Sequence, residues 1–215
     1  MSRFHGIVLM PGGYQVKHWE PGVGIVNGGV HKDIEDALRE RNRRWRASSR
    51  LMIKSVMIHH QIMGEGRTNT GYARVNEYED HRGVQGFCVT TRNLMNGANT
   101  TRRFSYENRR SPISREHALT LAVRYRNIHA QVFNRIVDRY NALVRDECLR
   151  LAEREVEEGQ PLIQRLYGFS LPRWNEARFD FDEVLLGIVN RGRPMDEVEA
   201  AVHELCAEDA QASAL

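Results

Sequence analysis

The residues best suited to chemistry in this chain are arginines that recur among short polar side chains between positions 72 and 110. Arginine binds phosphate oxygens or the edge of guanine through two parallel hydrogen bonds. The first part of the chain is also basic overall, because residues 1–137 hold 19 Arg and 3 Lys against 11 acidic residues. Residues 138–215 reverse this balance, with 9 Arg against 17 acidic residues. This distribution predicts an anionic partner for the first part of the chain.

Three β-strands are predicted to carry these arginines. Their sequences are GYARVNEY (71–78), GFCVTTR (86–92) and NTTRRFSY (99–106). Asn96-Gly97 separates the second strand from the third, and this dipeptide is a strong signal for a tight hairpin. Turns this short predict an antiparallel sheet, and a sheet of three short strands needs a helix to cover one face.

The covering helix is predicted from Arg115 to Glu158. Ser111-Pro112 precedes it as a helix-start signal, with Ser114 as an alternative cap. No Gly or Pro interrupts the helix, and Gly159 follows it. The expected fold class is α+β: a three-stranded antiparallel sheet packed on a long helix, with additional N-terminal β/helical and C-terminal helical segments. The predicted regions are 1–65 (β-hairpin and basic helix), 71–130 (β-β-β-α domain), 131–158 (helix extension for assembly) and 160–215 (acidic and helical).

Side chains alternate along a strand, so the pattern predicts which residues share a face of the sheet. The helix-facing set is predicted to be Ala73, Val75, Phe87, Val89 and Phe104. The opposite, polar face is predicted to hold Tyr72, Arg74, Asn76, Thr90, Arg92, Thr101 and Arg103. Arg82, Arg109 and Arg110 are expected at the rim, where phosphate contacts would orient the sheet. Arg102 shares the parity of Phe104 and is expected to curl outward at the sheet edge as a further contact.

The segment 71–130 resembles the Apetala/ethylene-response-factor type of DNA-binding domain, known in plant transcription factors and in phage, bacterial and homing-endonuclease proteins. The matching features are GYARV, GFCVTTR and TTRRFSYENRRSPISREHALTLAVRYRN, and they cover about 60 of the 215 residues. Phe87 stands where the family has Trp, Asn127 stands where it has Asp, and only Arg74 remains of an arginine-rich first strand. The resemblance implies that one sheet face packs on the helix and the other enters the major groove of DNA. A solvated polar face is the alternative, because antiparallel sheets often expose one.

Residues 1–65 are predicted to form short strands followed by a basic helix. FHGIVLM and YQVKHWE are the strand candidates, joined by the turn Pro11-Gly12-Gly13. The glycine-rich residues 21–30 are interpreted as a flexible connection, since no Lys-Ser/Thr follows to complete a phosphate loop. The helix predicted over 32–49 ends in a basic block, from which Arg43, Arg44 and Arg46 are predicted to contact DNA.

Signatures of catalysis and metal binding are weak. Glu77, Glu79 and Asp80 beside His81 would suit a metal-dependent nuclease, but acids in a β-turn are usually solvated and no second ligand set follows. His59 and His60 are neighbours whose side chains point apart, so they are unsuited to one metal ion. We therefore expect neither enzymatic activity nor a cofactor or metal.

Cellular location is indicated by cysteine usage and by hydropathy. Cys88, Cys148 and Cys206 are widely spaced and form no metal-type pair, a pattern that fits a reducing compartment. No apolar run is long enough to span a membrane. The expected location is the cytoplasm, or the host cytoplasm for a phage-encoded protein.

These features favour a non-catalytic DNA-binding protein of a phage or other mobile element, acting in transcription or replication. The sheet would contact DNA, and the long helix would assemble a homo-oligomer. The alternative is a single-stranded DNA-binding protein whose acidic C-terminal segment recruits a polymerase or another replication partner. Its base-stacking candidates are Tyr72, Phe87, Tyr106 and Trp45. A structural or oligomerisation protein, with the long helix as its working part, is the third possibility.

Overall fold

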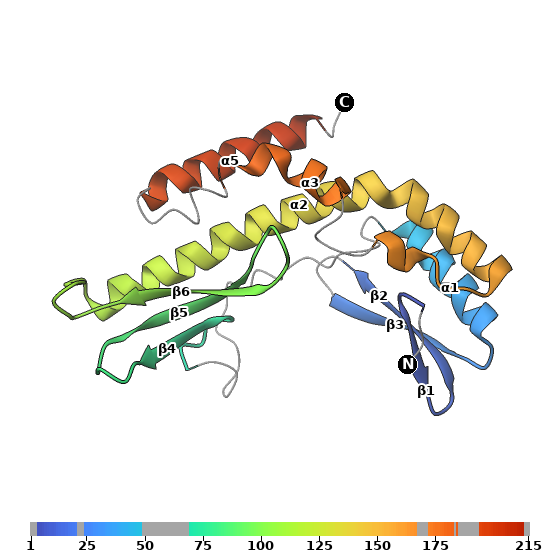
Figure 1. The fold of residues 1–215 in the computed structure, drawn as a ribbon, viewed down its shortest axis with the longest axis horizontal. Coiled ribbons are helices and arrows are strands. Elements are labelled where there is room, and N and C mark those ends of the chain that lie inside the picture. The colour runs from blue at the N-terminus through green and yellow to red at the C-terminus, as the bar shows by residue number, and fades with distance from the viewer. Residues whose placement is uncertain are drawn as a thin grey trace. The chain divides into compact units, whose positions relative to one another are not determined.

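The computed structural model describes residues 4–20, 24–48, 69–166, 172–182, 184 and 194–212. The chain divides into two compact units, each built from two separate segments. The first unit comprises Met1–Ser55 and Ile136–Arg178, and the second comprises Val56–Arg135 and Phe179–Leu215. The predicted α+β class is confirmed, because the structure contains two three-stranded antiparallel sheets together with helices (Figure 1). The units do not follow the linear division expected from the sequence, since each takes in a later part of the chain.

The first unit begins with a sheet in the order β1-β2-β3, followed by a helix. Its elements are β1 (Ile7–Met10), β2 (Gly13–Glu20), β3 (Gly24–His31) and α1 (Ile34–Ala47). β1 and β2 form a tight hairpin that closes at Met10 and Gly13, as the Pro-Gly-Gly turn predicts. Asp33 occupies the N-cap position of α1, again as predicted.

The interpretation of residues 21–30 as a flexible connection was wrong, because Gly24–His31 form strand β3. The strand accommodates its glycines through an irregularity: Gln15 pairs with Val30, whereas Lys17 pairs with Asn27. Gly28 is required there, because a Cβ would lie 2.9 Å from both the Arg44 side chain and the Val16 side chain. The pairing with β2, which no local sequence signal reveals, makes this segment a strand.

The core of the first unit lies between the sheet and α1. Ile7 and Val16 from the sheet pack with Ala37 and Leu38 from α1, and all four side chains are buried. The side of the sheet away from α1 is mixed: Val8, Gln15 and Val30 form one row across the three strands, and Lys17 pairs with Asn27 on the same side. Val8, Ile25 and Val30 are 37%, 60% and 53% exposed.

A buried ion pair joins α1 to the second half of the long helix α2 (Arg115–Glu158). Arg41 Nη1 lies 2.8 Å from Glu155 Oε2, and both side chains are fully buried. Arg41 also donates to the His5 carbonyl and to Asn42 Oδ1, while Glu155 Oε1 accepts from the backbone N–H groups of Leu162 and Ile163. The pair is thus embedded in a satisfied hydrogen-bond network, which is the condition under which buried charges are tolerated.

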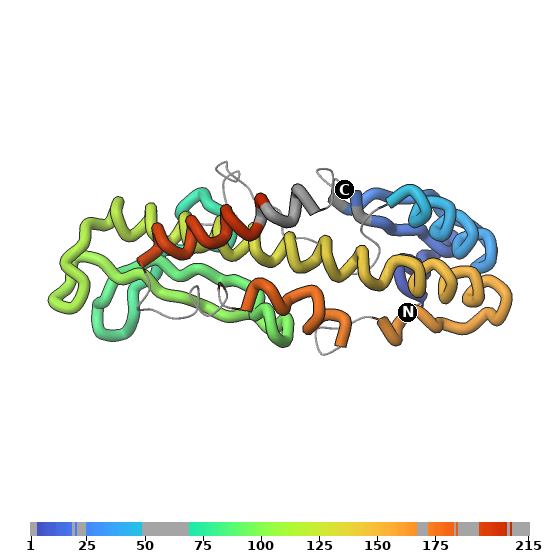
Figure 2. Tube along the Cα trace, turned by 90° about the horizontal axis from the view of Figure 1, so that it is seen from above, coloured from blue at the N-terminus to red at the C-terminus, as the bar shows by residue number. Residues whose placement is uncertain are grey.

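The second unit repeats the β-β-β-α order with a sheet in the order β4-β5-β6. Its elements are β4 (Val75–Glu79), β5 (Gln85–Arg92), β6 (Asn99–Ser105), the first half of α2, η2 (Phe179–Phe181) and α5 (Met195–Ala212). The predicted meander and its covering helix are confirmed, although β4 begins four residues later than the sequence suggested. Helix α5 lies along the first half of α2, where Val198 and Val202 are buried and Arg124 pairs with Asp196 and Glu199 (Figure 2).

The long helix α2 has the predicted bounds and serves both units. Residues up to Arg135 belong to the second unit, and residues from Ile136 belong to the first. Its second half contacts α1, the short helix η1 (Ile163–Leu166) and α3 (Pro172–Arg178), which the sequence did not predict. Tyr140 packs edge-on against Trp174, and both side chains are buried. Intrachain partners thus cover the apolar stripe of this half, and assembly through α2 stays a prediction.

Two sequence-based predictions fall on residues that the structure leaves undescribed. The apolar segment 51–63, whose sequence fits either a buried helix or a buried strand, lies outside the described ranges. The C-terminal region contains two sequences typical of short helices, over 181–190 and 194–209, and most of the first lies outside the described ranges as well. The second predicted C-terminal helix corresponds to α5.

We predict that Glu155→Gln lowers the free energy of unfolding by about 3–5 kcal/mol, because it leaves Arg41 buried without a compensating charge. Urea denaturation followed by circular dichroism measures the change. Glu153→Gln is the matched control, since Glu153 pairs with Arg46 at the surface, where both side chains are more than half exposed. The control should cost less than about 1 kcal/mol. Equal losses in the two variants would contradict a special role for the buried pair.

Candidate nucleic-acid interface

The sheet of the second unit has two chemically different sides. Val75, Phe87 and Val89 are fully buried on the side that faces α2, and Phe104 contacts the ring of Tyr125 there. The other side, here called the outer face, is defined by the alternate residues of the three strands. These are Asn76, Tyr78, Gly86, Cys88, Thr90, Arg92, Asn99, Thr101, Arg103 and Ser105. The outer face therefore contains two arginines and no carboxylate.

Strand pairing brings five of the seven predicted face residues together. Asn76 lies opposite Cys88, which lies opposite Arg103, so these three side chains form one row. Thr90 lies opposite Thr101 in the next row. Arg92 lies opposite Asn99 at the end of β5, and its guanidinium is exposed. The arrangement groups hydrogen-bond donors of three kinds, guanidinium, amide and hydroxyl, on one sheet surface.

Tyr72 and Arg74 were expected on strand β4, but both lie in the turn that precedes it. The extended conformation is broken because Gly71 and Arg74 have φ angles of 76° and 64°. Thr70 supports the turn, since its hydroxyl donates to the Val75 carbonyl at 2.6 Å. Arg74 nevertheless remains beside β5, because its carbonyl accepts a 3.0 Å hydrogen bond from the Thr90 N–H.

The carboxylates of β4, Glu77 and Glu79, alternate along the strand with the outer-face residues and therefore lie on the other side of the sheet. Glu77 accepts two hydrogen bonds from the Arg115 guanidinium, at 2.6 and 2.8 Å, and one from the Tyr106 hydroxyl at 2.6 Å. The hydrogen bonds from Arg115, and to a lesser extent the one from Tyr106, lower the pKa of Glu77 to about 2. This carboxylate therefore stays charged and committed to the start of α2. Glu79 accepts a hydrogen bond from Gln85.

Nine of the ten predicted DNA-contacting arginines separate into two groups by their partners. Those of the basic helix are ion-paired: Arg43 and Arg44 both bind Glu40, at 2.7 and 2.6 Å, and Arg46 binds Glu153. Six others have no carboxylate within ion-pair distance among the residues described by the structure. They are Arg74, Arg82, Arg92, Arg103, Arg109 and Arg110. All six are exposed, so their charge is available to a partner.

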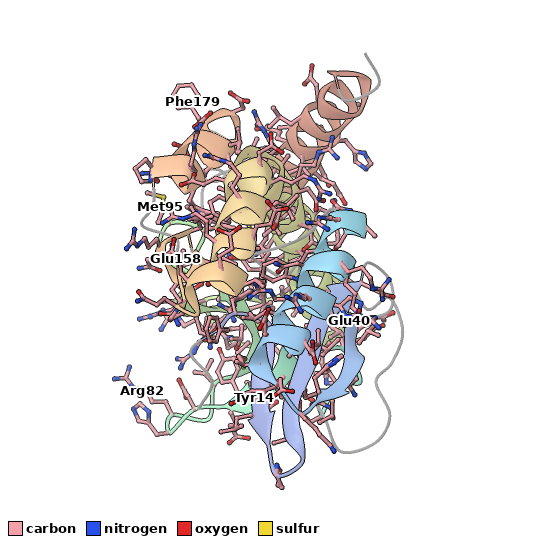
Figure 3. All side chains as sticks on the ribbon, turned by 90° about the vertical axis from the view of Figure 1, so that its right-hand side faces the viewer. Tyr14, Glu40, Arg82, Met95, Glu158 and Phe179 are labelled. Atoms are coloured by element: carbon pink, nitrogen blue, oxygen red, sulfur yellow. The ribbon has the colours of Figure 1, made fainter. Side chains whose placement is uncertain are left out.

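The three rim arginines are held in tight turns at the edges of the sheet. Asp80 Oδ1 accepts hydrogen bonds from the backbone N–H groups of Arg82 and Val84, which closes the β4–β5 turn. The Arg82 side chain extends away from the ribbon in Figure 3. Arg109 and Arg110 occupy the turn between Asn108 and Ser111, which bond to each other through their backbones. Backbone turns thus position these cations while leaving their side chains in solvent.

Arg102 does not curl outward as expected. Its guanidinium lies over the Tyr125 ring at 4.7 Å from the centroid and over the Phe104 ring at 5.5 Å. Because both rings belong to the packing between sheet and helix, Arg102 covers the edge of that core. It remains a predicted DNA contact that no observation tests.

Tyr78 is the one aromatic side chain of the outer face among its ten residues, and it was not predicted from the sequence. The Arg103 guanidinium lies over its ring, 5.1 Å from the ring centroid, and Gly86 leaves room for Tyr78, since a Cβ there would lie 2.9 Å from the Tyr78 hydroxyl. The two-residue spacing from Asn76 could have identified it. Of the four aromatics proposed for base stacking, Phe87, Tyr106 and Trp45 are 0%, 4% and 2% exposed, so they cannot stack on a ligand without unfolding. Tyr72, the fourth, is half-buried.

Other chemistries find no support within the described ranges. No group of three or more His, Cys, Asp or Glu side chains is placed to hold a metal ion among those residues. Glu79 is exposed and Glu77 is bound to Arg115, so the acids considered for a nuclease centre do not converge. Among the described helices, none combines the length and the apolar character needed to cross a membrane.

We predict that the stabilising effect of Glu77 disappears in acid. Its pKa is lower in the folded chain than in the unfolded chain, so its contribution is complete above about pH 4.5 and is lost as the pH falls towards about 2. Circular dichroism measures the thermal unfolding of wild type and Glu77→Gln from pH 7 to pH 2. Wild type should have the higher Tm at pH 7, and the Tm values of the two proteins should converge in acid. Glu79→Gln, the control, should follow wild type. Parallel curves for Glu77→Gln and wild type would contradict the assignment.

Comparison of the chain with models of known protein families, with curated protein sequences and with solved structures found no match. Functional inference therefore depends on the geometry of this chain. The feature that distinguishes it is the outer face, where arginines, amides and hydroxyls lie together without a carboxylate.

Proposed function

We propose that this protein is a non-catalytic DNA-binding protein that contacts DNA through the outer face of the β4-β5-β6 sheet. The observation that carries the proposal is the separation of charge across this sheet. Glu77 is held on the helix side by Arg115, whereas Arg92 and Arg103 project from the outer face. A polyanion approaching the outer face meets cations and hydrogen-bond donors and no fixed negative charge on the strands themselves.

The dimensions of a three-stranded sheet suit the major groove. Neighbouring strands are about 4.8 Å apart, and the groove is about 12 Å wide, so two or three strands can enter it. Arg103 would then reach base edges, where arginine binds guanine through two hydrogen bonds. Arg82, Arg109 and Arg110 would contact phosphates on either side and set the orientation of the sheet.

The resemblance to Apetala/ethylene-response-factor domains supports this mode of binding, since it implies the same use of a sheet face. We propose on this basis a phage or mobile-element protein that acts in transcription or replication, in the cytoplasm where its DNA is found. The arginines of α1 are left out of the proposed interface, because Arg43, Arg44 and Arg46 have carboxylate partners of their own.

Binding of single-stranded DNA is the second candidate, and Tyr78 is the observation that favours it. An aromatic ring with a guanidinium beside it on an open sheet is a suitable platform for an unpaired base. The acidic residues of α5 fit the accompanying idea of partner recruitment only in part. Asp196 and Glu199 are engaged by Arg124, whereas Glu197 and Glu204 are exposed.

The test is fluorescence anisotropy with labelled duplex and single-stranded oligonucleotides, titrated from about 50 to about 200 mM NaCl. We predict that Arg74→Gln/Arg92→Gln/Arg103→Gln raises the Kd at least about tenfold at the lower salt concentration. It should also reduce the slope of log K against log salt by about 0.9 for each of these arginines that contacts phosphate. A stronger effect on single strands than on duplex would favour the second candidate.

The matched control removes three charges that are already neutralised. Arg39, Arg154 and Arg173 each pair with a carboxylate of the same helix, and all three are exposed. The triple variant Arg39→Gln/Arg154→Gln/Arg173→Gln has the same net charge as the test variant, so it reports the effect of net charge alone. Equal affinities of the two triple variants for every form of DNA would rule out the outer face as the interface.

A further inference from the structure

Arg74 lies beside β5, the strand that ends at Arg92. The Arg74 carbonyl accepts a 3.0 Å hydrogen bond from the Thr90 N–H, so Arg74 stands opposite Thr90. Arg92 is two residues further along β5, on the same face as Thr90. The two arginines are therefore diagonal neighbours, at a spacing that long side chains bridge.

The backbone at Arg74 adopts a conformation that is unusual for a residue with a side chain. Its φ angle of 64° lies in the left-handed region, which is disfavoured for all residues except glycine and, less strongly, asparagine and aspartate. A glycine at this position would remove the strain, as Gly71 does three residues earlier. Strained residues persist where a side chain is needed in a particular place, so the guanidinium of Arg74 becomes a candidate for function.

The surroundings of these arginines are cationic or neutral. No carboxylate lies within ion-pair distance of either one among the described residues. Desolvation lowers the pKa of Arg74, and the charge of Arg92 lowers it further. The neighbouring His129 on α2 is buried, its pKa is lowered to about 4 by desolvation and by Arg74, and it bonds to the backbone of Arg92. At neutral pH His129 therefore supports the end of β5 without adding charge.

The hydrogen-bonding capacity of the pair is largely unused. Arg92 Nη1 donates to the Gly97 carbonyl at 3.5 Å, which is long for a hydrogen bond. The Arg74 guanidinium donates to no group in the part of the chain that the structure describes. Two guanidinium groups thus present free N–H donors at one place, where their mutual repulsion would be relieved by an anion.

We infer that Arg74 and Arg92 form a clamp for a single phosphate group. The inference deepens the proposed function, on which it rests, by assigning this end of the outer face to a backbone phosphate of the bound nucleic acid. It leaves Arg103, in the row with Asn76 and Cys88, for contact with a base. A free phosphorylated molecule offers the same chemistry and is the second possible source.

The clamp is tested with inorganic phosphate, which needs no assumption about the nucleic acid. Thermal unfolding is measured at pH 7 in sodium phosphate and in sodium chloride of equal ionic strength. We predict that phosphate raises the Tm of wild type by roughly 2–4 °C relative to chloride. Arg92→Gln and Arg74→Gly should lose this difference, whereas Arg103→Gln should keep it. Arg74→Gly relieves the backbone strain, so its Tm in chloride should not fall, and a lost response cannot be ascribed to unfolding.

A second readout reports on the two side chains directly. The Nε–H resonances of Arg74 and Arg92, assigned by these variants, should move during a phosphate titration and not during a chloride titration.

An equal phosphate response in wild type, Arg92→Gln and Arg74→Gly would overturn the clamp, even for a chain that binds DNA through Arg103. A phosphate response without any affinity for DNA would support the clamp and identify a free phosphorylated molecule as its ligand. A response accompanied by weaker DNA binding of both variants would assign it to the nucleic-acid backbone.

Discussion

The inward position of the Glu77 carboxylate is the constraint on which the proposed interface depends. Strand alternation places Glu77 on the side of α2, where Arg115 and Tyr106 bind it. One interaction therefore has two consequences. It fixes the start of the helix to the sheet, and it keeps a permanent negative charge away from the outer face. A shift of β4 by one residue would place Glu77 and Glu79 among Arg92 and Arg103, and the electrostatic basis for binding an anion would be lost.

The two units use the same β-β-β-α order for different surfaces. The first sheet exposes Val8, Ile25 and Val30, whereas the second exposes arginine, threonine and asparagine at the corresponding side. The shared order follows from the need of a small sheet to bury one face on a helix. Packing on a helix constrains the side chains of only one sheet face, so the side chains of the other face are available for function. The outer face of the second unit, with two arginines and no carboxylate, is therefore informative in a way that its fold is not.

Local sequence signals predicted most of the second unit. Asn96-Gly97, the alternation of Val75, Phe87 and Val89, and Gly159 after the long helix all act over a few residues, and the hairpin, the buried sheet face and the helix end that they predict are present in the structure. Alternation failed only at the start of β4, where Tyr72 and Arg74 lie in a turn. The features that were missed depend on distant residues. Strand β3 forms because it pairs with β2, and Arg41 is neutralised by Glu155, 114 positions away. The same limit explains why Arg46 looked like a free cation in the sequence, because its partner Glu153 lies on α2. It does not apply to Arg43 and Arg44, whose partner Glu40 is on the same helix.

The measurement that tests the central claim most directly uses Cys88, whose half-buried thiol lies in the middle of the outer face between Asn76 and Arg103. The rate of its alkylation by N-ethylmaleimide can be followed by peptide mass spectrometry, with the buried Cys148 as an internal reference. If DNA lies on the outer face, saturating DNA should protect Cys88 strongly at low salt, and high salt should remove the protection. An unchanged rate of Cys88 alkylation under conditions where anisotropy shows the DNA to be bound would contradict the account.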